Sequence, residues 1–285
     1  MEQITQQWVK ERLPFRKPDG HKGDFGRVLA VCGAVGYTGA PVFAAKGAVR
    51  SGVGLVFLAV PESIYPVVAV KCDEAMPFPL PAQDGVLSSQ ALQPLLQRIS
   101  DYDALLLGCG LGCGPGVDEV VCGLLGSVQC PVVLDADGIN CVARHIHVLD
   151  SRQGQVTVLT PHEGEFLRLG GDLSLGWETA ARSFAEKHGC YLILKGHRTV
   201  VASPQGELLR NTTGNCGMAK GGSGDVLAGM LLSFLGQGLE PLQAAGIAVF
   251  LHGRSGDLCA KELSEYAMTP SDVVEHLPQA FLSLL

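Results

Sequence analysis

The sequence RVLAVCGAVGYTGAPVFAAKGAVRSGVGLVFLAV, residues 27–60, decides the fold class of the chain. Its first segment, RVLAVCG (27–33), is a short apolar run of the kind that forms a buried strand. APVFAAKGAVRSG (40–52) then predicts a helix that ends near Gly52, and GLVFLAV (54–60) predicts a second buried strand. Two strands joined by a helix indicate a βαβ unit, in which the strands lie parallel in one sheet.

The same alternation continues along the rest of the chain. Short apolar runs predict further strands, and apolar residues at helical spacing predict helices between and after them. The predicted strands lie at 103–110, 130–137, 154–160 and 189–196, a β-hairpin at 198–211, and helices at 62–70, 223–235, 241–263 and 271–284. We therefore expect an α/β fold with a mostly parallel central sheet flanked by helices. We expect a single domain over residues 1–285, because no linker, composition shift or internal repeat divides the chain.

Composition narrows the classes of function. Of the 285 residues, 47% are hydrophobic and 17% are charged, so the chain can bury a large core, while its formal net charge of -7 disfavours a general nucleic-acid binder. No apolar run predicts a membrane span, and the polar N-terminus lacks the apolar segment of a signal peptide. These features predict a cytoplasmic protein, and in such a protein the ten cysteines, which are scattered and form no C-x-x-C pair, are expected to be reduced.

The strongest functional signal is GMAKGGSGDVLAGMLL, residues 217–232. Ser223 is placed to cap a helix with one apolar face, so the glycines of KGGSGD fall at a helix N-terminus. Free backbone N–H groups, the positive end of the helix dipole and glycines without a Cβ form a cradle for a phosphate or an oxyanion. Asp225, in the first turn, would face the reacting group as a general base. The alternative is a tight turn with an acidic first-turn residue, since short glycine motifs recur by chance.

Other polar segments follow the predicted strands, where ligands bind in parallel α/β folds. LKGHRTVVA places residues 195–199 between two strands, either as a phosphate contact or as a solvated hairpin turn. His162 follows a strand that ends at Pro161, in an acid-rich stretch that is also typical of a helix start. Asp135 and Asp137 end another strand, where they would help to bind Mg²⁺ through water or cap the next turn.

In this order and spacing, from about His21 to the C-terminus, GHKGDFGRVL, LTPHEGEF, LKGHRTVV and TGNCGMAKGGSGDVLAGM resemble the NAD(P)H-hydrate dehydratases of the ribokinase-like superfamily. The resemblance implies a ribokinase-like three-layer sandwich in which the dehydratase domain stands alone. It implies a repair reaction, the dehydration of the (S)-epimer of hydrated NADH or NADPH by phosphorylation of the ring hydroxyl and elimination of phosphate. ADP or ATP as co-substrate, Mg²⁺ as cofactor, a homotetramer and a separate epimerase partner are implied as well.

By position, the resemblance makes Asp225 the base that meets the hydroxyl of the hydrated substrate. It leaves the role of Asn140 open and assigns no metal ligand. The residues implied to bind the nucleotide are Lys195, Gly196, His197, Arg198, Thr199, Gly221, Gly222, Ser223 and Gly224. The residues implied to bind hydrated NAD(P)H are Ala40, Gly110, His162 and Asp225.

Two positions depart from the family pattern, and two other functions stay open. Cys109 replaces a proline in GCGLG, which loosens that loop because proline fixes φ, and Glu163 replaces a proline in TPHEGE, which adds a negative charge near a site for phosphates. One alternative function is a ribokinase-like kinase of a small alcohol or vitamin precursor, in which Asp225 would keep its role. The other is a nucleotide-binding protein without turnover. GHKGDFGRV and LTPHEGEF favour the dehydratase over the kinase, and the presence of Asp225 favours an enzyme over a binding protein.

Overall fold

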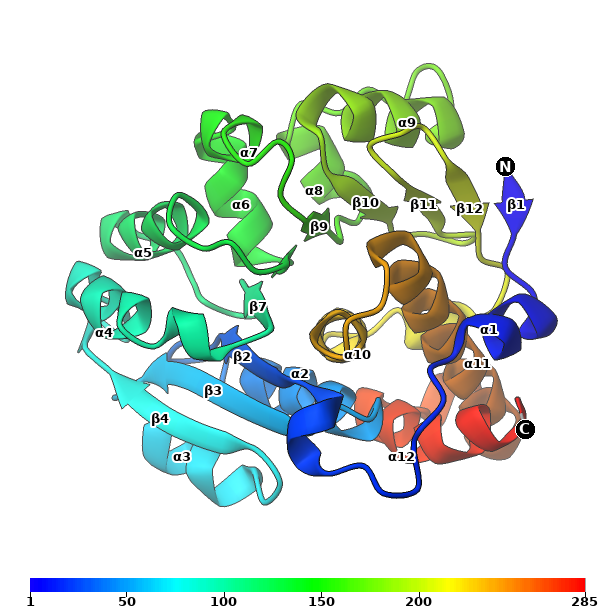
Figure 1. Cartoon of the computed structure of the whole chain (residues 1–285), viewed down its shortest axis with the longest axis horizontal. Helices are drawn as coiled ribbons and strands as arrows, with labels where there is room; N and C mark the ends of the chain where they lie inside the picture. Colours follow the sequence, from blue (N-terminus) through cyan, green and yellow to red (C-terminus); the bar gives the residue numbers. More distant parts are fainter. Residues whose placement is uncertain (285) are drawn as a thin grey trace.

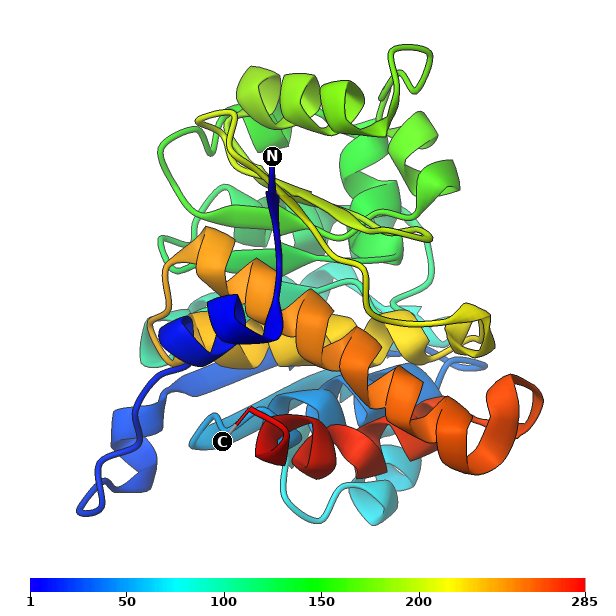
Figure 2. The ribbon, with the colours of Figure 1, turned by 90° about the vertical axis from the view of Figure 1, so that its right-hand side faces the viewer.

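The computed structural model describes residues 1–284 and is built around one ten-stranded sheet (Figures 1 and 2). The strand order is β1-β12-β11-β10-β9-β8-β7-β2-β3-β4. Every neighbouring pair from β10 to β4 is parallel, β11 is antiparallel to both of its neighbours, and β1 lies parallel to β12 at the edge. The strands are β1 (Glu2–Gln3), β2 (Arg27–Val31), β3 (Leu55–Pro61), β4 (Met76–Leu80), β7 (Ala104–Leu107), β8 (Val132–Leu134), β9 (Thr157–Leu159), β10 (Tyr191–Leu194), β11 (Val200–Ala202) and β12 (Leu208–Arg210), and a separate small sheet pairs β5 (Ala82–Gln83) with β6 (Val86–Leu87).

Helices cover both faces of this sheet, so the predicted three-layer α/β sandwich is confirmed. One face carries α1 (Gln6–Arg12), α2 (Gly39–Arg50), α3 (Tyr65–Lys71), α10 (Ser223–Gly236), α11 (Pro241–Ala267) and α12 (Pro270–Leu282). The other carries α4 (Leu92–Leu96), α5 (Pro115–Leu125), α6 (Asp137–Arg144), α7 (His147–Asp150), α8 (Glu163–Arg168) and α9 (Trp177–His188). The 3₁₀ turns are η1 (Lys22–Phe25), η2 (Ser89–Ala91), η3 (Ile99–Asp101) and η4 (Cys216–Met218).

The central strands are apolar throughout because both of their faces are covered. In β2, Val28 and Ala30 pack into the core under α2 and α10, whereas Leu29 and Val31 pack into the core under α5. A strand buried on both faces needs no polar residue at alternate positions, which explains the continuous apolar runs in the sequence.

Helix α10 lies inside the arc of the curved sheet and packs directly on α2 (Figure 1). A Cβ at Gly229 of α10 would collide with the backbone of Ala44 in α2. Glycine at this position therefore lets the two helices approach closely, and part of the glycine content of the segment serves packing rather than ligand binding.

The predicted elements are present, with differences at their ends. The helix predicted at 62–70 begins only at Tyr65, and Pro66 occupies its first turn. The helix predicted to end at Leu263 runs to Ala267 across a break at Ser264, whose φ is 70°. Among residues 1–284, no helix combines the length and the apolar character that crossing a membrane requires.

Candidate active site

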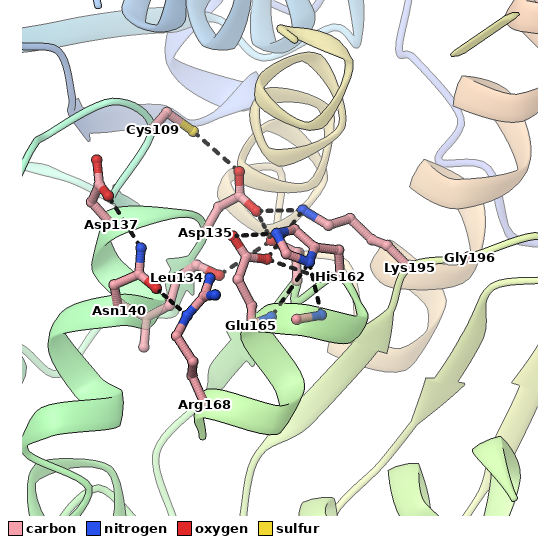
Figure 3. Close-up of polar contacts among 12 residues, drawn as sticks. Cys109, Leu134, Asp135, Asp137, Asn140, His162, Glu165, Arg168, Lys195 and Gly196 are labelled. Atoms are coloured by element: carbon pink, nitrogen blue, oxygen red, sulfur yellow. Dashed lines mark hydrogen bonds and ion pairs between the residues drawn. The ribbon is translucent and has the colours of Figure 1, made fainter. Parts of the chain in front are cut away.

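The carboxyl ends of the central strands meet the N-terminus of α10. Cys109 follows β7, Asp135 follows β8, and Asp225 lies in the first turn of α10. One thiol or carboxylate atom from each of the three lies within 4.8 Å of the other two. Lys195, at the end of β10, reaches the same point and places its Nζ 2.8 Å from Asp135 Oδ1 (Figure 3). Segments far apart in the sequence thus converge where parallel α/β folds bind ligands.

Asp225 is a carboxyl group with a strongly raised pKa. Burial is the main cause, and the nearby negative charge of Asp135 adds to it. A hydrogen bond from the Cys109 thiol and the charge of Lys195 act in the opposite direction, and the resulting pKa is about 6. A carboxylate with a pKa near the working pH is suited to accept a proton from a hydroxyl group.

The neighbouring carboxylate, Asp135, is held by a buried polar network (Figure 3). Its Oδ1 accepts hydrogen bonds from Lys195 Nζ and, at 2.6 Å, from Thr160 Oγ1, and a carboxylate oxygen of Glu165 lies 3.9 Å from Lys195 Nζ. Burial raises the pKa of Asp135, but the charge and hydrogen bonds of these partners outweigh burial and hold it below its ordinary value. The two adjacent aspartates are therefore driven apart in pKa, one ionised and one suited to proton transfer.

The glycine loop before Asp225 has the geometry of an anion cradle. The N-cap of α10 is Gly222, with a φ of 103°, and the first bond of the helical ladder runs from Val226 N to Gly222 O at 3.2 Å. The N–H groups of Gly224 and Asp225 precede that ladder and are available to an anion. Gly221 has open space around it, and an ideal Cβ at Gly224 would lie 3.4 Å from Lys195 Nζ.

The expectation that Ser223 caps α10 is wrong. Ser223 is the first helical residue, and its buried hydroxyl lies 3.4 Å from His252 Nε2 of α11. The cap position needs a positive φ, which glycine adopts without strain, so Gly222 takes it.

The predicted nucleotide segment 195–199 divides into two parts. The Lys195 side chain points into the buried network, whereas Gly196, His197 and Arg198 are exposed in the β10–β11 hairpin. Gly196 packs on the ring of Trp177, and the Thr199 hydroxyl donates to Gly196 O at 3.2 Å. The solvated-turn alternative thus describes the hairpin tip and not Lys195.

His162 is the N-cap of α8. Its Nδ1 accepts hydrogen bonds from Gly164 N at 3.0 Å and Glu165 N at 3.4 Å, and its side chain remains 55% exposed. The capping alternative is therefore correct for the Nδ1 edge of the ring, while Nε2 lies 3.5 Å from Glu165 Oε1. Glu163 lies exposed in the same first turn, where a carboxylate complements the helix dipole.

Gly110 and Ala40 are neighbours in the structure. A Cβ at Gly110 would lie 2.9 Å from the Cβ of Ala40 and 2.8 Å from that of Tyr37. Tyr37 is 58% exposed, so an aromatic ring borders these two positions. The preceding Cys109 is fully buried; a hydrogen bond with Cys32, followed by burial, holds its pKa well above the ordinary value, so the thiol stays protonated.

Asn140 braces the loop after β7. Its Nδ2 donates to Asp137 Oδ1 at 3.2 Å, and its Oδ1 accepts from Arg168 Nε at 2.9 Å (Figure 3). Asp137 Oδ2 in turn accepts from Gly112 N at 2.8 Å. Asp137 thus binds the loop after β7 through Gly112 N and does not act as the N-cap of α6, which is Ala136; a water-mediated contact of Asp137 with Mg²⁺ stays a prediction.

Sequence reasoning missed three groups at this site. Thr160 and Glu165 belong to the network around Asp135, and their signal was position, since both lie in the LTPHEGEF motif. Ala136 adopts a φ of 48° and a ψ of -113°, a strained conformation between two site aspartates. An alanine in the sequence does not predict this backbone strain.

This architecture and site define a ribokinase-like α/β protein with a phosphoryl-transfer type of centre. A ribokinase-like superfamily protein from Enterococcus faecalis V583 is similar in structure, with a TM-score of 0.86, 26% identity and coverage of 99% of this chain and 96% of that chain. The family model described as NAD(P)H-hydrate dehydratase matches residues 28–279. The chain belongs to the NAD(P)H-hydrate dehydratase family, as its motifs predicted.

Named proteins of this family resemble the chain in sequence and in structure. An ADP-dependent (S)-NAD(P)H-hydrate dehydratase of Bacillus subtilis (strain 168) is 33% identical over 281 residues, 97% of this chain and 96% of that protein. The crystal structure of an ADP/ATP-dependent NAD(P)H-hydrate dehydratase from Bacillus subtilis, co-crystallized with ATP/Mg²⁺, has a TM-score of 0.82 at 30% identity and covers 100% of this chain and 99% of that chain. The Bifunctional NAD(P)H-hydrate repair enzyme Nnr of Moorella thermoacetica is 42% identical over 286 residues, which are 99% of this chain and 54% of that protein. The chain thus spans about half the length of the bifunctional relatives that it matches.

Proposed function

We propose that the protein is a nucleotide-dependent (S)-NAD(P)H-hydrate dehydratase, which removes water from hydrated NADH or NADPH and restores the dihydronicotinamide ring. The observation that carries the proposal is the position of Asp225, a carboxyl with a pKa of about 6 beside free N–H groups at the start of α10. Because the chain belongs to the dehydratase family, we take hydrated NADH or NADPH as the substrate on which this base and cradle act.

The proposed reaction has two steps. Asp225 accepts the proton of the ring hydroxyl, whose oxygen attacks the terminal phosphorus of the nucleotide; the bond to the bridging oxygen breaks, and AMP leaves when ADP is the donor. The carbon–oxygen bond of the phosphate ester then breaks, a neighbouring ring carbon loses a proton, and the ring double bond forms. Backbone N–H groups at Gly224 and Asp225 and the charge of Lys195 would stabilise the transferring phosphoryl group.

We assign the ligand contacts in two groups around Asp225. The nucleotide group comprises residues 195–199 and the loop 221–224, and its support is the approach of Lys195 Nζ to Gly224. The substrate group comprises Ala40, Gly110 and His162, and its support is the contact between the first two and the half-exposed ring of the third.

Mg²⁺ is part of the proposal as the companion of the nucleotide phosphates. Carboxylate oxygens of Asp135 and Glu165 lie 2.8 and 3.9 Å from Lys195 Nζ, and carboxylate and water oxygens are the ligands that Mg²⁺ prefers. Both carboxylates already accept hydrogen bonds or ion pairs from protein groups, so they fit an ion that is held through water. When bound, the ion supplies charge neutralisation on the phosphates.

Four further expectations stay predictions from the sequence. These are a single dehydratase domain over residues 1–285, a homotetramer, a separate epimerase that acts with the protein, and a cytoplasmic location. The choice between ADP and ATP is part of the experiment below.

The test mixes the purified protein with hydrated NADH, Mg²⁺ and either ADP or ATP, and follows the absorbance of the restored dihydronicotinamide ring. We expect a rise that requires nucleotide, and the nucleotide with the higher kcat/KM is the donor. If folded protein that binds nucleotide gives no rise with either donor, the dehydratase proposal is wrong. A screen of small alcohols and vitamin precursors for phosphorylation then tests the kinase alternative.

A further inference from the structure

The loop that carries the anion cradle has little structure of its own. Residues 211–222 contain one short 3₁₀ turn, η4, and otherwise extend between β12 and α10. Such a segment loses much conformational entropy when it is ordered, more so where it contains glycine. Because the cradle requires its N–H groups in fixed positions, another element must hold this loop.

That element is α11, which runs alongside the loop (Figure 2). Asp257 of α11 accepts a hydrogen bond from Gly214 N at 3.1 Å through Oδ2 and from Asn215 Nδ2 at 3.2 Å through Oδ1. Asn215 Oδ1 in turn accepts from Gly217 N at 3.0 Å. A single carboxylate thus fixes the middle of the loop by two charge-assisted hydrogen bonds and a relay.

His252, five residues earlier on α11, meets the other end of the loop. Its Nε2 lies 3.4 Å from Ser223 Oγ, at the start of α10, and both side chains are buried. Burial, followed by the charge of Lys195, lowers the pKa of His252 to about 4, so the ring is neutral at physiological pH. A neutral imidazole places no additional charge beneath the cradle.

The helix surface between these two side chains is shaped to the loop. A Cβ at Gly253 would collide with Thr213, and a Cβ at Gly256 would collide with the side chain of Met218. The loop therefore lies directly against the helix backbone. HGRSGD (252–257) combines two glycines for close approach with two polar side chains that bind the loop.

We propose that His252 and Asp257 are positioning residues, which hold loop 211–222 and the first turn of α10 on α11 so that the anion cradle and Asp225 are preorganised. Both contact the loop from the side of α11 rather than the reacting groups. The inference rests on the proposed function, because that function supplies the nucleotide phosphate that the cradle would bind.

The first test uses Asp257→Asn in the full chain, with Asp150→Asn as the matched control. Asp150 also accepts a hydrogen bond from a buried partner, His188 Nδ1 at 2.5 Å, but it lies on α7 and not on α11. We expect Asp257→Asn to accelerate amide hydrogen exchange in residues 211–224 and to weaken ADP binding by about 10-fold, the worth of one lost charge-assisted hydrogen bond. The control should change neither quantity.

The exchange measurement separates this inference from the proposed function, since it requires no turnover. Unchanged exchange of residues 211–224 in folded Asp257→Asn overturns the positioning role, whatever the enzyme activity. Faster exchange with unchanged ADP affinity overturns the link to the cradle. If the dehydratase assay fails but both effects appear, positioning stands and the substrate proposal fails.

The second test compares His252→Gln with His252→Ala. The Gln amide nitrogen reproduces the reach of the imidazole Nε2, so we expect His252→Gln to retain most of the kcat that His252→Ala loses. Combining Ser223→Ala with His252→Ala should cost no more than the larger single change, because both remove the same contact. Equal losses in the Gln and Ala variants, or fully additive effects with Ser223→Ala, contradict the role of His252.

Discussion

Arg152 is a buried charged side chain and Asp225 a half-buried one, and the protein surrounds them in opposite ways. Arg152 is 1% exposed, and its guanidinium donates to the Thr157 hydroxyl at 2.9 Å and to four backbone carbonyls. Asp225 lies beside a second aspartate, and its attraction to Lys195 and the Cys109 thiol does not offset burial.

The difference separates a charge that protein groups satisfy from a carboxyl group whose pKa stays raised. The donors of Arg152 are directed to acceptors inside the protein, so this side chain links the turn after α7 to the last residue of α5, Leu125, and to Val128 beyond it. Asp225 keeps a raised pKa because its surroundings stabilise its charge incompletely, which is the property that a general base requires.

Of the substitutions that test this difference between Asp225 and Arg152, Asp225→Asn should have the largest effect. We expect kcat for the dehydration to fall by about 10² or more, because a positioned base is lost. Nucleotide binding should persist, and the free energy of unfolding at pH 7 should stay equal or increase, since a buried like-charge neighbour of Asp135 is removed. Steady-state kinetics, calorimetry with ADP and urea denaturation measure the three quantities. Unchanged kcat removes Asp225 from the role of base.

Arg152→Met should show the reverse pattern. The substitution leaves buried carbonyl groups without donors, so we expect the free energy of unfolding to fall by about 3 kcal/mol. The kcat of the folded fraction should not change, because this side chain lies away from the strand ends that form the site. Arg182→Met is the control, since Arg182 is exposed and donates to one carbonyl, Gly206 O, at 3.1 Å. Equal destabilisation by both variants would contradict a structural role for the buried network.

Substitutions of the adjacent Gly221 and Gly222 distinguish the effect of backbone strain from the effect of blocking the approach of ADP to the backbone. Gly222→Val forces a β-branched residue into a φ of 103° and against Phe43, so we expect weaker ADP binding, by about 10-fold or more, and lower stability. Gly221→Ala meets open space and should leave the melting temperature unchanged. Any loss of ADP affinity in Gly221→Ala then measures how closely the ligand approaches that backbone. Intact ADP affinity in Gly222→Val counts against the cradle.

The smallest expected effect is a pH dependence. If Asp225 acts as a base, kcat/KM should fall as the pH drops through about 6, the pKa of this carboxyl. Since the pKa is raised from its ordinary value of 3.8, the group favours folding below about pH 4, and this contribution is lost as the pH rises through about 6. A pH–rate profile with no acidic limb between pH 5 and 7 would oppose the assignment.

Much of the fold follows from local sequence patterns. The apolar runs predicted the central strands, because strands covered on both faces need no polar residues, and GGSGD predicted the start of α10. The short strand β4 was not predicted, because Pro77 and Pro79 are unusual within a strand; they are accommodated where β4 forms the edge of the sheet and pairs on one side only. The cap of α10 was assigned to Ser223 because serine favours that position, yet the backbone conformation there selects Gly222.

The sequence motifs predicted which segments form the candidate site, but not which side chains contact one another there. The capping role of His162, which the structure shows, and its proposed ligand contact could not be separated by pattern, since both favour the same residue at the same place. Asn140 gained a role only when the fold brought Arg168 beside it. His252 and Asp257 were missed because they lie inside a long helix, where polar residues are ordinarily solvent-facing.

The sequence by itself determined the alternation of strands and helices, the glycine loop at a helix start and the family, because these depend on neighbours within a few residues. Only the tertiary structure decided which charges meet. It joined Asp135 to Lys195 across 60 positions of sequence, set Asp225 beside them and raised its pKa to about 6. The physical reason is that burial and Coulomb interactions depend on distances in space, and those distances exist only after parallel strands have brought their carboxyl ends to one edge of the sheet.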